Sequence, residues 1–340
     1  MKIAIHHNPG SFSDRWIEYC KEKEIPYKVV NAYDSDIVTQ LEDCDVFMWH
    51  HHHADYKDVL FAKQLLYSLE LSGKEVFPNY HTTWHFDDKV GQKYLLESLG
   101  APLVPSYVFY TKKDAYNWVN NTTFPKVFKL RGGASSANVR LVHNKREAIK
   151  LIDKAFSKGF SQFDGWSAFK DRLVKWKGKK ESFWGVCKGF ARIFISTEFA
   201  RMHAPEKGYA YFQDFIPNNQ YDLRIVVVGG NKAFGIKRLV RQNDFRASGS
   251  GSLIYEKSQL NENCVKIAFD IAKKIKSQSI AFDFIYDKNN KPLIVEISYG
   301  YAIKAYYPCQ GYWTDDMQWH QGSHFDIEGW MIENLLNKKQ

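Results

Sequence analysis

The sequence lacks long apolar runs and any recognisable export signal. Its purely apolar stretches are short, such as Ile-Val-Val-Val at 225–228, whereas a membrane span needs about 18 such residues. The first seven residues resemble a β-strand, whereas a secretory signal would need a basic start, an apolar stretch and a small-residue cleavage site. We therefore expect no membrane span and a cytoplasmic location.

Cysteine is scarce, and two common phosphate-binding motifs are missing. The five cysteines form no Cys-x-x-Cys pair, which argues against a disulfide framework or a zinc knuckle and indicates reduced thiols. Cys309 has no histidine pair beside it, so we do not expect it to be a nucleophile. The first strand is not followed by Gly-x-Gly-x-x-Gly, and no Gly-Lys-Ser/Thr of a Walker loop is present. A dinucleotide site of the common type and a P-loop are thereby excluded.

Basic residues outnumber acidic ones, and the length suits several structural units. The chain has 340 residues, 44% of them hydrophobic, which is ample for two or three cores. The formal net charge of +9 suits phosphate, carboxylate or nucleic-acid partners. Lysines and aromatics interleave at 170–180, as they do in nucleic-acid grooves, but such a run is more often a solvated surface segment. We expect nucleic acid not to be the partner.

Strand and helix patterns alternate along the first eighty residues. Strands are predicted at 2–6, 27–30, 46–49 and 75–77, with helices at 12–23, 35–41 and 57–72, an order typical of βαβ units and a parallel sheet. His50, His51, His52 and His53 follow the third strand, at the sheet edge where open α/β sheets bind ligands. We interpret them as an exposed or acceptor-lining loop in preference to a metal site, because consecutive side chains diverge.

A second unit begins near residue 80. Its predicted elements are helices at 87–99 and 261–276 and strands at 106–110, 124–130, 209–216, 222–228, 280–285 and 293–297. Residues 154–202 are rich in lysine and aromatics and poorly periodic, and we interpret them as an insertion. The aromatic tail from Tyr306 to Trp330 fits a core, or less often a sugar-binding wall.

Two features of the second unit carry chemistry. Lys129 ends a strand and precedes Arg131-Gly132-Gly133-Ala134-Ser135-Ser136, a loop whose backbone amides are able to approach phosphate oxygens. Asp283 and Glu296 lie inside apolar strand patterns, where a carboxylate is costly without a partner. That partner is either a metal such as Mg²⁺ or an arginine, for which Arg224 and Arg238 are the candidates.

The ordered series of these motifs resembles the ATP-grasp carboxylate–amine ligases, near glutathione synthetase and the ribosomal-protein glutamate ligases. The series comprises Lys89, Lys129 with its glycine loop, Gln213-Asp214-Phe215-Ile216, Asp222-Leu223-Arg224, Arg238, Phe245-Arg246, Asp283 and Glu296-Ile297-Ser298. The resemblance implies an α/β protein in which a Rossmann-like pre-ATP-grasp domain (1–80) precedes a two-lobed ATP-grasp fold (81–210 and 211–340).

The resemblance also implies roles for individual residues. Arg224, Arg238 and Arg246 would stabilise the transferring phosphoryl group, and Asp283, Glu296 and Ser298 would hold Mg²⁺. Ser298 occupies the position where the family usually has asparagine, so the resemblance supports a second metal ion less strongly than the first. The ATP-binding residues implied are Lys89, Lys129, Gly132, Gly133, Ala134, Ser135, Ser136, Gln213, Asp214 and Ile216.

The expected activity is amide formation through an acyl phosphate. ATP and Mg²⁺ are the expected cofactors, and the partners are a carboxylate and an amine. The carboxylate belongs either to an amino acid or peptide, or to a uronic-acid sugar of a surface polysaccharide, which the aromatic tail mildly favours. A homodimer is compatible with the sequence. The alternative is a non-catalytic nucleotide- or nucleic-acid-binding protein.

Overall fold

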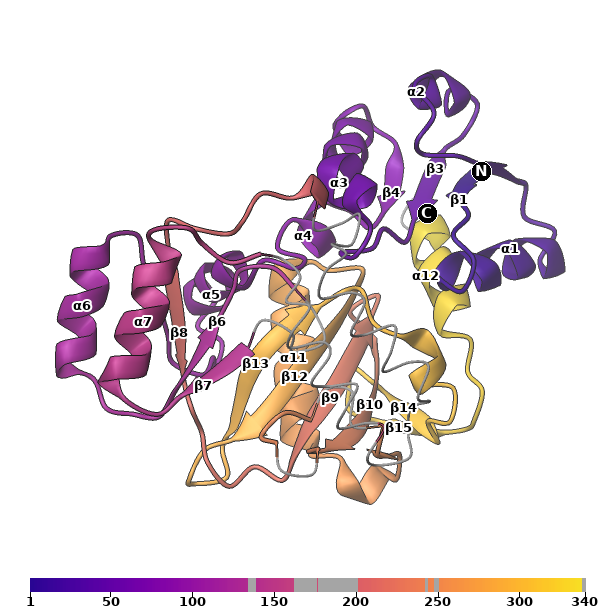
Figure 1. Cartoon of the computed structure of the whole chain (residues 1–340). Coiled ribbons are helices and arrows are strands. Elements are labelled where there is room, and N and C mark those ends of the chain that lie inside the picture. Colours follow the sequence, from indigo (N-terminus) through magenta and orange to yellow (C-terminus); the bar gives the residue numbers. More distant parts are fainter. Residues whose placement is uncertain (134–138, 162–175, 177–200, 242–243, 248–250, 338–340) are drawn as a thin grey trace.

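Three β-sheets and their helices form the part of the chain that the structure describes. The computed structural model describes residues 1–133, 139–161, 176, 201–241, 244–247 and 251–337 (Figure 1). Most of the expected insertion at 154–202, and of its basic stretch at 170–180, lies outside these residues. No helix among those described is both long enough and apolar enough to span a membrane.

The first sheet is parallel, with strand order β2-β1-β3-β4. Its two central strands, β1 (Ile3–His6) and β3 (Val46–Trp49), are buried along their whole length, as expected for strands covered on both faces. Each crossover between parallel strands contains a helix. The other elements of this unit are β2 (Tyr27–Val30), β4 (Glu75–Phe77), α1 (Phe12–Glu22), α2 (Ile37–Gln40) and α3 (Tyr56–Leu71).

The second sheet is antiparallel, with order β5-β8-β6-β7. Two helices that the sequence pattern did not predict, α6 and α7, pack on it, and Phe128 and Phe212 of the sheet share their core with Ile152 of α7. Each of these helices begins at a capping residue, Thr111 or Asn144, whose side chain accepts a backbone N–H. The elements are β5 (Ser106–Phe109), β6 (Lys126–Lys129), β7 (Val139–Val142), β8 (Ala210–Asp214), α6 (Lys112–Asn121) and α7 (Lys145–Ala155).

The third sheet is also antiparallel, with order β13-β12-β9-β10-β14-β15 and β11 paired to β10. Helix α11 (Glu262–Ile275) packs on one face, and the loops that form the site lie on the other side of the sheet, toward the second sheet (Figure 1). The strands are β9 (Tyr221–Val228), β10 (Lys232–Leu239), β11 (Leu253–Ile254), β12 (Ser279–Tyr286), β13 (Pro292–Ser298), β14 (Gly311–Thr314) and β15 (Trp319–Gln321). Two short helices, α4 (Tyr80–Thr83) and α5 (Lys89–Ser98), join the first sheet to the rest.

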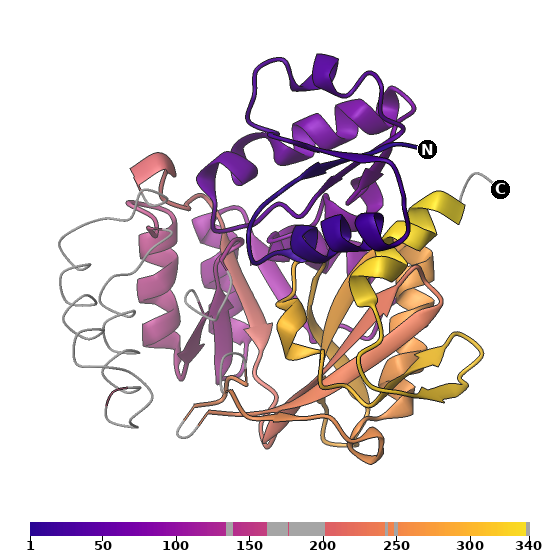
Figure 2. The ribbon, with the colours of Figure 1, turned by 90° about the vertical axis from the view of Figure 1, so that its right-hand side faces the viewer.

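One hydrophobic core joins the first and third sheets. It contains Phe12 and Trp16 of α1 together with Phe234 of β10 and residues of the C-terminal helix α12 (Ile327–Leu336). Helix α12 lies against α1 (Figure 2), where Arg15 forms an ion pair of 2.6 Å with Asp326. The first sheet also has a core of its own, formed by residues within 4–76, so one core respects the predicted boundary at residue 80 and another crosses it. The C-terminal helix packs on the first helix of the chain.

Most of the aromatic tail belongs to this interior. Trp313 and Tyr306 are fully buried, and Trp330 stacks on Phe325 with ring centroids 5.1 Å apart. Their burial agrees with the preferred interpretation, a core, although Tyr306 also lines a cavity. Cys309 is also buried, which raises the pKa of its thiol to about 12 and keeps it protonated, so it is no nucleophile.

Candidate active site

The strand register of the third sheet brings the predicted charged residues side by side. Asp283 of β12 lies opposite Arg224 of β9 on one side and opposite Glu296 of β13 on the other. Arg238 of β10 lies opposite Asp222 of β9. Directly opposed residues of neighbouring strands share a face, so their side chains are close enough to interact.

Asp283 is held by two arginines. The Arg224 guanidinium donates to its two oxygens at 2.5 and 2.7 Å, and Arg238 donates to Oδ2 at 2.8 Å. Arg238 also donates two hydrogen bonds of 2.6 Å to the Asp222 carboxylate. Burial opposes the charged form of Asp283, but the two guanidinium groups lower its pKa well below the usual range. Of the two partners expected for Asp283, a metal or an arginine, the structure thus shows the arginines.

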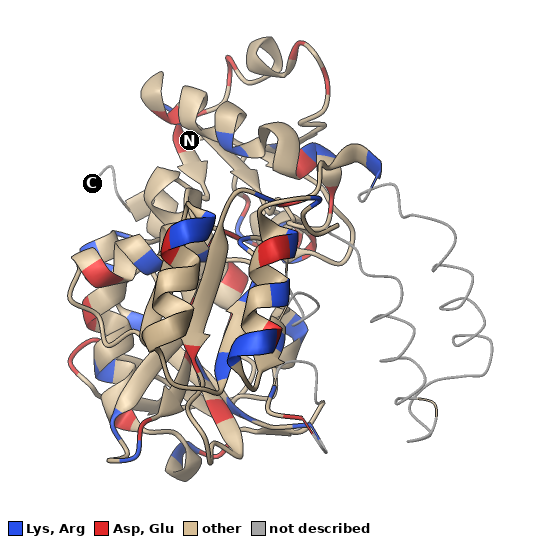
Figure 3. Ribbon diagram, turned by 60° about the vertical axis from the view of Figure 1, so that its left-hand side comes forward, with Lys and Arg blue, Asp and Glu red and all other residues tan. Residues whose placement is uncertain are grey.

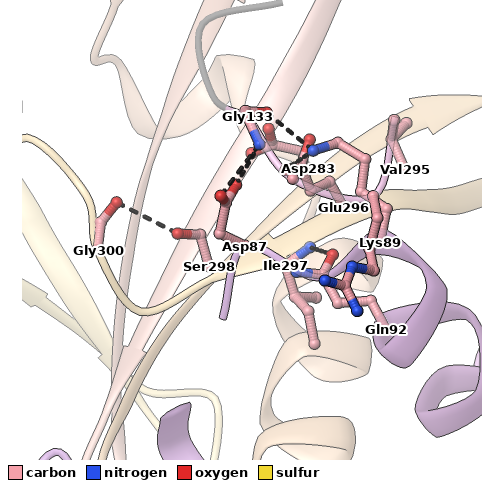
Figure 4. Close-up of polar contacts among 12 residues, drawn as sticks. Asp87, Lys89, Gln92, Gly133, Asp283, Val295, Glu296, Ile297, Ser298 and Gly300 are labelled. Carbon is pink, nitrogen blue, oxygen red and sulfur yellow. Dashed lines mark hydrogen bonds and ion pairs between the residues drawn. The ribbon is translucent and has the colours of Figure 1, made fainter. Parts of the chain in front are cut away.

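The Glu296 carboxylate is more exposed to solvent than that of Asp283. Its side chain is 34% exposed, and its nearest ion-pair partner is Lys89 Nζ, at 3.6 Å. Ser298 follows on the same strand and donates its hydroxyl to Gly300 O at 3.2 Å (Figure 4). The described residues include no cluster of three His, Cys, Asp or Glu side chains arranged as a ready metal cage. A carboxylate beside phosphate oxygens nevertheless suits Mg²⁺, which keeps much of its water. Glu296 fits the implied ion better than Asp283, because both oxygens of Asp283 accept from Arg224 or Arg238.

A cavity of about 160 Å³ opens between the second and third sheets. Its walls are largely apolar and include Val127, Ile216, Ile285 and Val295, which suit a flat ring system. A bulge in the β12–β13 pairing leaves Val295 unpaired in the ladder between Glu296 and Ile294. The lining also includes Lys129, Gln213, Asp214 and Arg246.

Lys129 supplies this cavity with a buried cation. Only 5% of the residue is exposed, and no described residue accepts a hydrogen bond from its Nζ. Burial lowers the pKa of Lys129 to about 8. A buried ammonium without an acceptor is suited to an incoming anion such as a phosphate.

The chain segment after β8 closes the same cavity. Gln213 is buried and donates its amide to Ser106 Oγ at 3.0 Å, while Asp214 pairs with Lys126 at 2.6 Å. These side chains therefore brace the segment and leave Ile216 on the cavity wall. Arg246 also lies on this wall, where its guanidinium forms an ion pair of 2.7 Å with Asp244.

The glycine-rich loop is described only at its start. Gly132 N–H donates to Glu206 at 3.1 Å, and Gly133 N–H donates to Asp87 at 2.9 and 3.0 Å, so carboxylates occupy the amides we expected to face phosphates. Lys89 Nζ donates to Gly133 O at 2.9 Å. Ala134, Ser135 and Ser136 lie outside the described residues.

A larger cavity, of about 670 Å³, adjoins the first and shares Arg238, Asp283 and Glu296 with it. Loops after β1 and β3 of the first sheet line its far side, including Gly10 and His50. Arg224, Lys89, Tyr301 and Tyr306 line the rest, so the cavity combines cations with aromatic surface.

The four histidines divide between this cavity and the core. His50 stacks on Phe12 with ring centroids 3.7 Å apart, and its Nδ1 accepts the Phe12 N–H at 3.3 Å. His51 is buried with Nε2 2.8 Å from Thr83 Oγ1. Burial lowers the pKa of His50 to about 3 and that of His53 to about 4, so both are neutral at pH 7. No described metal cluster includes them, and three of the four line the larger cavity.

Asp87, Glu206 and Asp222 form contacts in the site that sequence reasoning did not assign to them. Asp87 precedes Asp88, the capping residue of α5, and resembles an ordinary acidic helix start. Glu206 follows closely on the stretch interpreted as an insertion. No local sequence signal marked these residues, because the start of α5 and the glycine loop meet only in the fold, where Lys89 N–H donates to Arg131 O at 3.0 Å.

Known structures with the same fold span the whole chain. The RimK-domain ATP-grasp protein of Sphaerobacter thermophilus superposes with a TM-score of 0.56 at 13% identity, covering 99% of this chain and all of that one. D-Alanine–D-alanine ligase of Bacillus anthracis gives 0.54 at 16% identity, with 100% and 98% covered. Biotin carboxylase of Campylobacter jejuni gives 0.58 at 14% identity, with 98% and 70% covered. No curated protein sequence matches the chain.

A family model adds sequence similarity to this likeness of fold. The RimK-like ATP-grasp domain matches residues 201–306, the part of the chain that contains Arg224, Arg238, Asp283 and Glu296. The order of the motifs, the fold and this match agree with one another. Residues 201–306 therefore match an ATP-grasp domain, and the chain as a whole shares its fold with solved ATP-grasp ligases.

Proposed function

We propose that the protein joins a carboxylate to an amine through an acyl phosphate, with release of ADP and phosphate. The observation that carries this proposal is the pair of adjoining cavities that meet at Arg238, Asp283 and Glu296. One cavity suits a nucleotide, and the other has room for a second substrate beside the same charges. The first sheet, with its four parallel strands, would be the Rossmann-like unit that supplies the far wall.

Positioning and electrostatic stabilisation account for most of such a phosphoryl transfer. Lys129 and Lys89 would hold the phosphates, and Arg224 and Arg238 would steady the acyl phosphate. Mg²⁺, held by Glu296 and Asp283, would neutralise charge on the phosphate oxygens when bound. The neighbour PsnB, an ATP-grasp ligase solved with a minimal precursor (TM-score 0.56, 11% identity, 100% and 99% covered), shares this fold.

The choice of carboxylate now rests on the larger cavity and no longer on the tail. The tail rings lie mostly in the core, so they do not favour a uronic-acid sugar over an amino acid or peptide. Tyr301, Tyr306 and His50 give the cavity ring surfaces that either class is able to contact. We propose a carboxylate on a skeleton larger than a single small amino acid, because the cavity is about 670 Å³.

The alternative of a nucleic-acid-binding protein has less support. Among the described residues in the view of Figure 3, Lys and Arg are interspersed with Asp and Glu along the same helices and do not form a band of one sign. Arg224 and Arg238 line a cavity and are paired with Asp283 and Asp222.

Release of ADP tests the proposal. Pools of carboxylates and amines are supplied with Mg·ATP, and the products are identified by mass spectrometry. We expect ADP and an amide only when both substrates are present. Nucleotide binding without ADP release from any pair would favour a non-catalytic binder.

A further inference from the structure

The backbone segment between β6 and the glycine-rich loop is held by carboxylates. Arg131 N–H donates to Glu206 Oε2 at 3.1 Å and to the Tyr209 hydroxyl oxygen at 2.6 Å. Gly132 N–H donates to Glu206 Oε1 at 3.1 Å, and both oxygens of Asp87 accept from Gly133 N–H. Three consecutive amides are thus fixed by two acidic side chains that lie far apart in the sequence.

The carbonyl groups of the same segment position Lys89. Arg131 O accepts the Lys89 backbone N–H at 3.0 Å, and Gly133 O accepts Lys89 Nζ at 2.9 Å. Figure 4 shows Asp87 and Lys89 both directed at Gly133. Because Lys129 is the last residue of β6, just before this segment, the position of the segment affects both lysines.

The two carboxylates pack closely around Gly132. A Cβ at this position would meet Glu206 Oε1 at 3.1 Å and Asp87 Oδ2 at 3.2 Å, which is tighter than most Cβ contacts. Glu206 is anchored through its backbone, which exchanges hydrogen bonds of 2.8 and 2.9 Å with Phe160 of the second core. Asp87 has a φ of +54°, a conformation that non-glycine residues rarely adopt unless their surroundings hold them there.

The position of Asp87 and Glu206 beside a phosphate site is electrostatically unfavourable. The pKa of Asp87 is raised to about 6, chiefly by desolvation and also by the nearby Glu296 and Glu206, although Lys89 and the Gly133 N–H lower it. Placing two acidic groups beside a phosphate site repels the nucleotide. A geometric role explains their presence, since a fixed segment keeps both ammonium groups in place without reorganisation when the ligand binds.

We propose that Asp87 and Glu206 are positioning residues for ATP: they hold residues 131–133 so that Lys89 and Lys129 face the nucleotide phosphates. This inference rests on the nucleotide site of the proposed function. It predicts that loss of either carboxylate weakens ATP binding, although removal of a negative charge near phosphates would by itself strengthen binding. The sign of the change therefore separates positioning from simple repulsion.

The test is calorimetric measurement of ATP affinity in the full chain. Asp87→Ala and Glu206→Ala should each raise the Kd by about tenfold, the usual effect of losing hydrogen bonds to a charged group. Asp87→Asn and Glu206→Gln keep one acceptor oxygen and should recover part of the affinity. Asp88→Asn is the matched control, because it removes the neighbouring charge while asparagine caps α5 equally well; we expect less than a twofold change.

Each outcome decides the matter. Equal or tighter ATP binding in both alanine variants would overturn the inference. If these variants unfold at a much lower temperature, Asp87→Asn and Glu206→Gln decide: weaker binding than wild type with unchanged Tm supports positioning, and unchanged or tighter binding refutes it. Wild-type protein that binds no ATP would refute the proposed function and the inference together, whereas unaffected variants of a binding-competent wild type refute the inference alone.

Discussion

The two adjoining cavities differ in how their cations are used. In the smaller cavity the ammonium of Lys129 has no hydrogen-bond acceptor among the described residues. In the larger cavity Arg224 and Arg238 are paired with Asp283 and Asp222. In the proposed function, an anion would therefore pair directly with Lys129, whereas the arginines of either cavity, including Arg246 with its partner Asp244, would need an exchange of partners to bind one.

Glu296→Gln should have the largest effect on the acceptor side. Neutralising a carboxylate that holds Mg²⁺ is expected to lower turnover by about 10³-fold, since the metal contributes several kcal/mol. Steady-state ADP release at saturating Mg²⁺ measures it. Glu262→Gln, at the exposed start of α11, is the control and should change turnover little. Near wild-type turnover for Glu296→Gln would show that this carboxylate holds no metal.

Arg224→Lys should reduce the rate but not nucleotide affinity. A lysine cannot reproduce the planar fork on an acyl phosphate, so we expect a loss of about 10² in single-turnover rate with ATP affinity within a few fold. Arg140→Lys, on the exposed side of β7, should leave both quantities unchanged. Equal losses of rate and affinity would instead place Arg224 on the nucleotide side.

Lys129→Met should show the opposite pattern to Arg224→Lys, because it should reduce ATP affinity. We expect ATP affinity to fall by about tenfold or more, because a charged contact to phosphate is lost. The Tm should not fall, since the variant removes a buried ammonium whose charged form is penalised by burial. Calorimetry and thermal unfolding measure the two quantities. Unchanged affinity would contradict the predicted role of Lys129.

Lys129 should also make ATP binding take up protons. Burial lowers its pKa from 10.5 to about 8, so the folded protein holds fewer protons than the unfolded chain between these values, and stability rises with pH in that window. A bound phosphate raises the pKa again. At pH 8 we expect uptake of roughly half a proton per ATP, measured by calorimetry in buffers of different ionisation enthalpy. Persistent uptake in Lys129→Met would assign it to another group.

Ser298→Asn should have the smallest effect. It restores the amide that the family usually has, and both side chains offer a neutral oxygen to Mg²⁺. We expect turnover within about threefold of wild type and equal or tighter Mg²⁺ dependence. A large loss would mean that the Ser298 hydroxyl, which donates to Gly300 O, fixes the loop after β13.

The sequence predicted elements well where local signals were strong. The strands at 27–30, 46–49 and 75–77 have the bounds expected from their apolar runs. Helices α6 and α7 were missed because each is short, rich in polar residues and stable through packing on the second sheet. Helix α12 was missed because the tail was interpreted only by its aromatic content, whereas this helix packs in the core beside α1.

The site was predictable as residue types but not as pairings. Asp283 required a cation or metal because it is a carboxylate in an apolar strand, and Arg224 was a candidate from the sequence. Only the strand register decides that they lie opposite each other. Asp87 and Glu206 carried no local signal, since their contacts to residues 131–133 depend on how α5 packs beside the second sheet.

Trapping of an acyl phosphate with hydroxylamine tests the central claim most directly. The protein is incubated with Mg·ATP, a library of carboxylates and hydroxylamine, which attacks an acyl phosphate in place of the natural amine. We predict a hydroxamate formed in equal amount to ADP for at least one carboxylate, and neither product in Glu296→Gln on the same timescale. ADP formed without hydroxamate, at a rate independent of the carboxylate, would contradict a ligase that activates a carboxylate by phosphorylation.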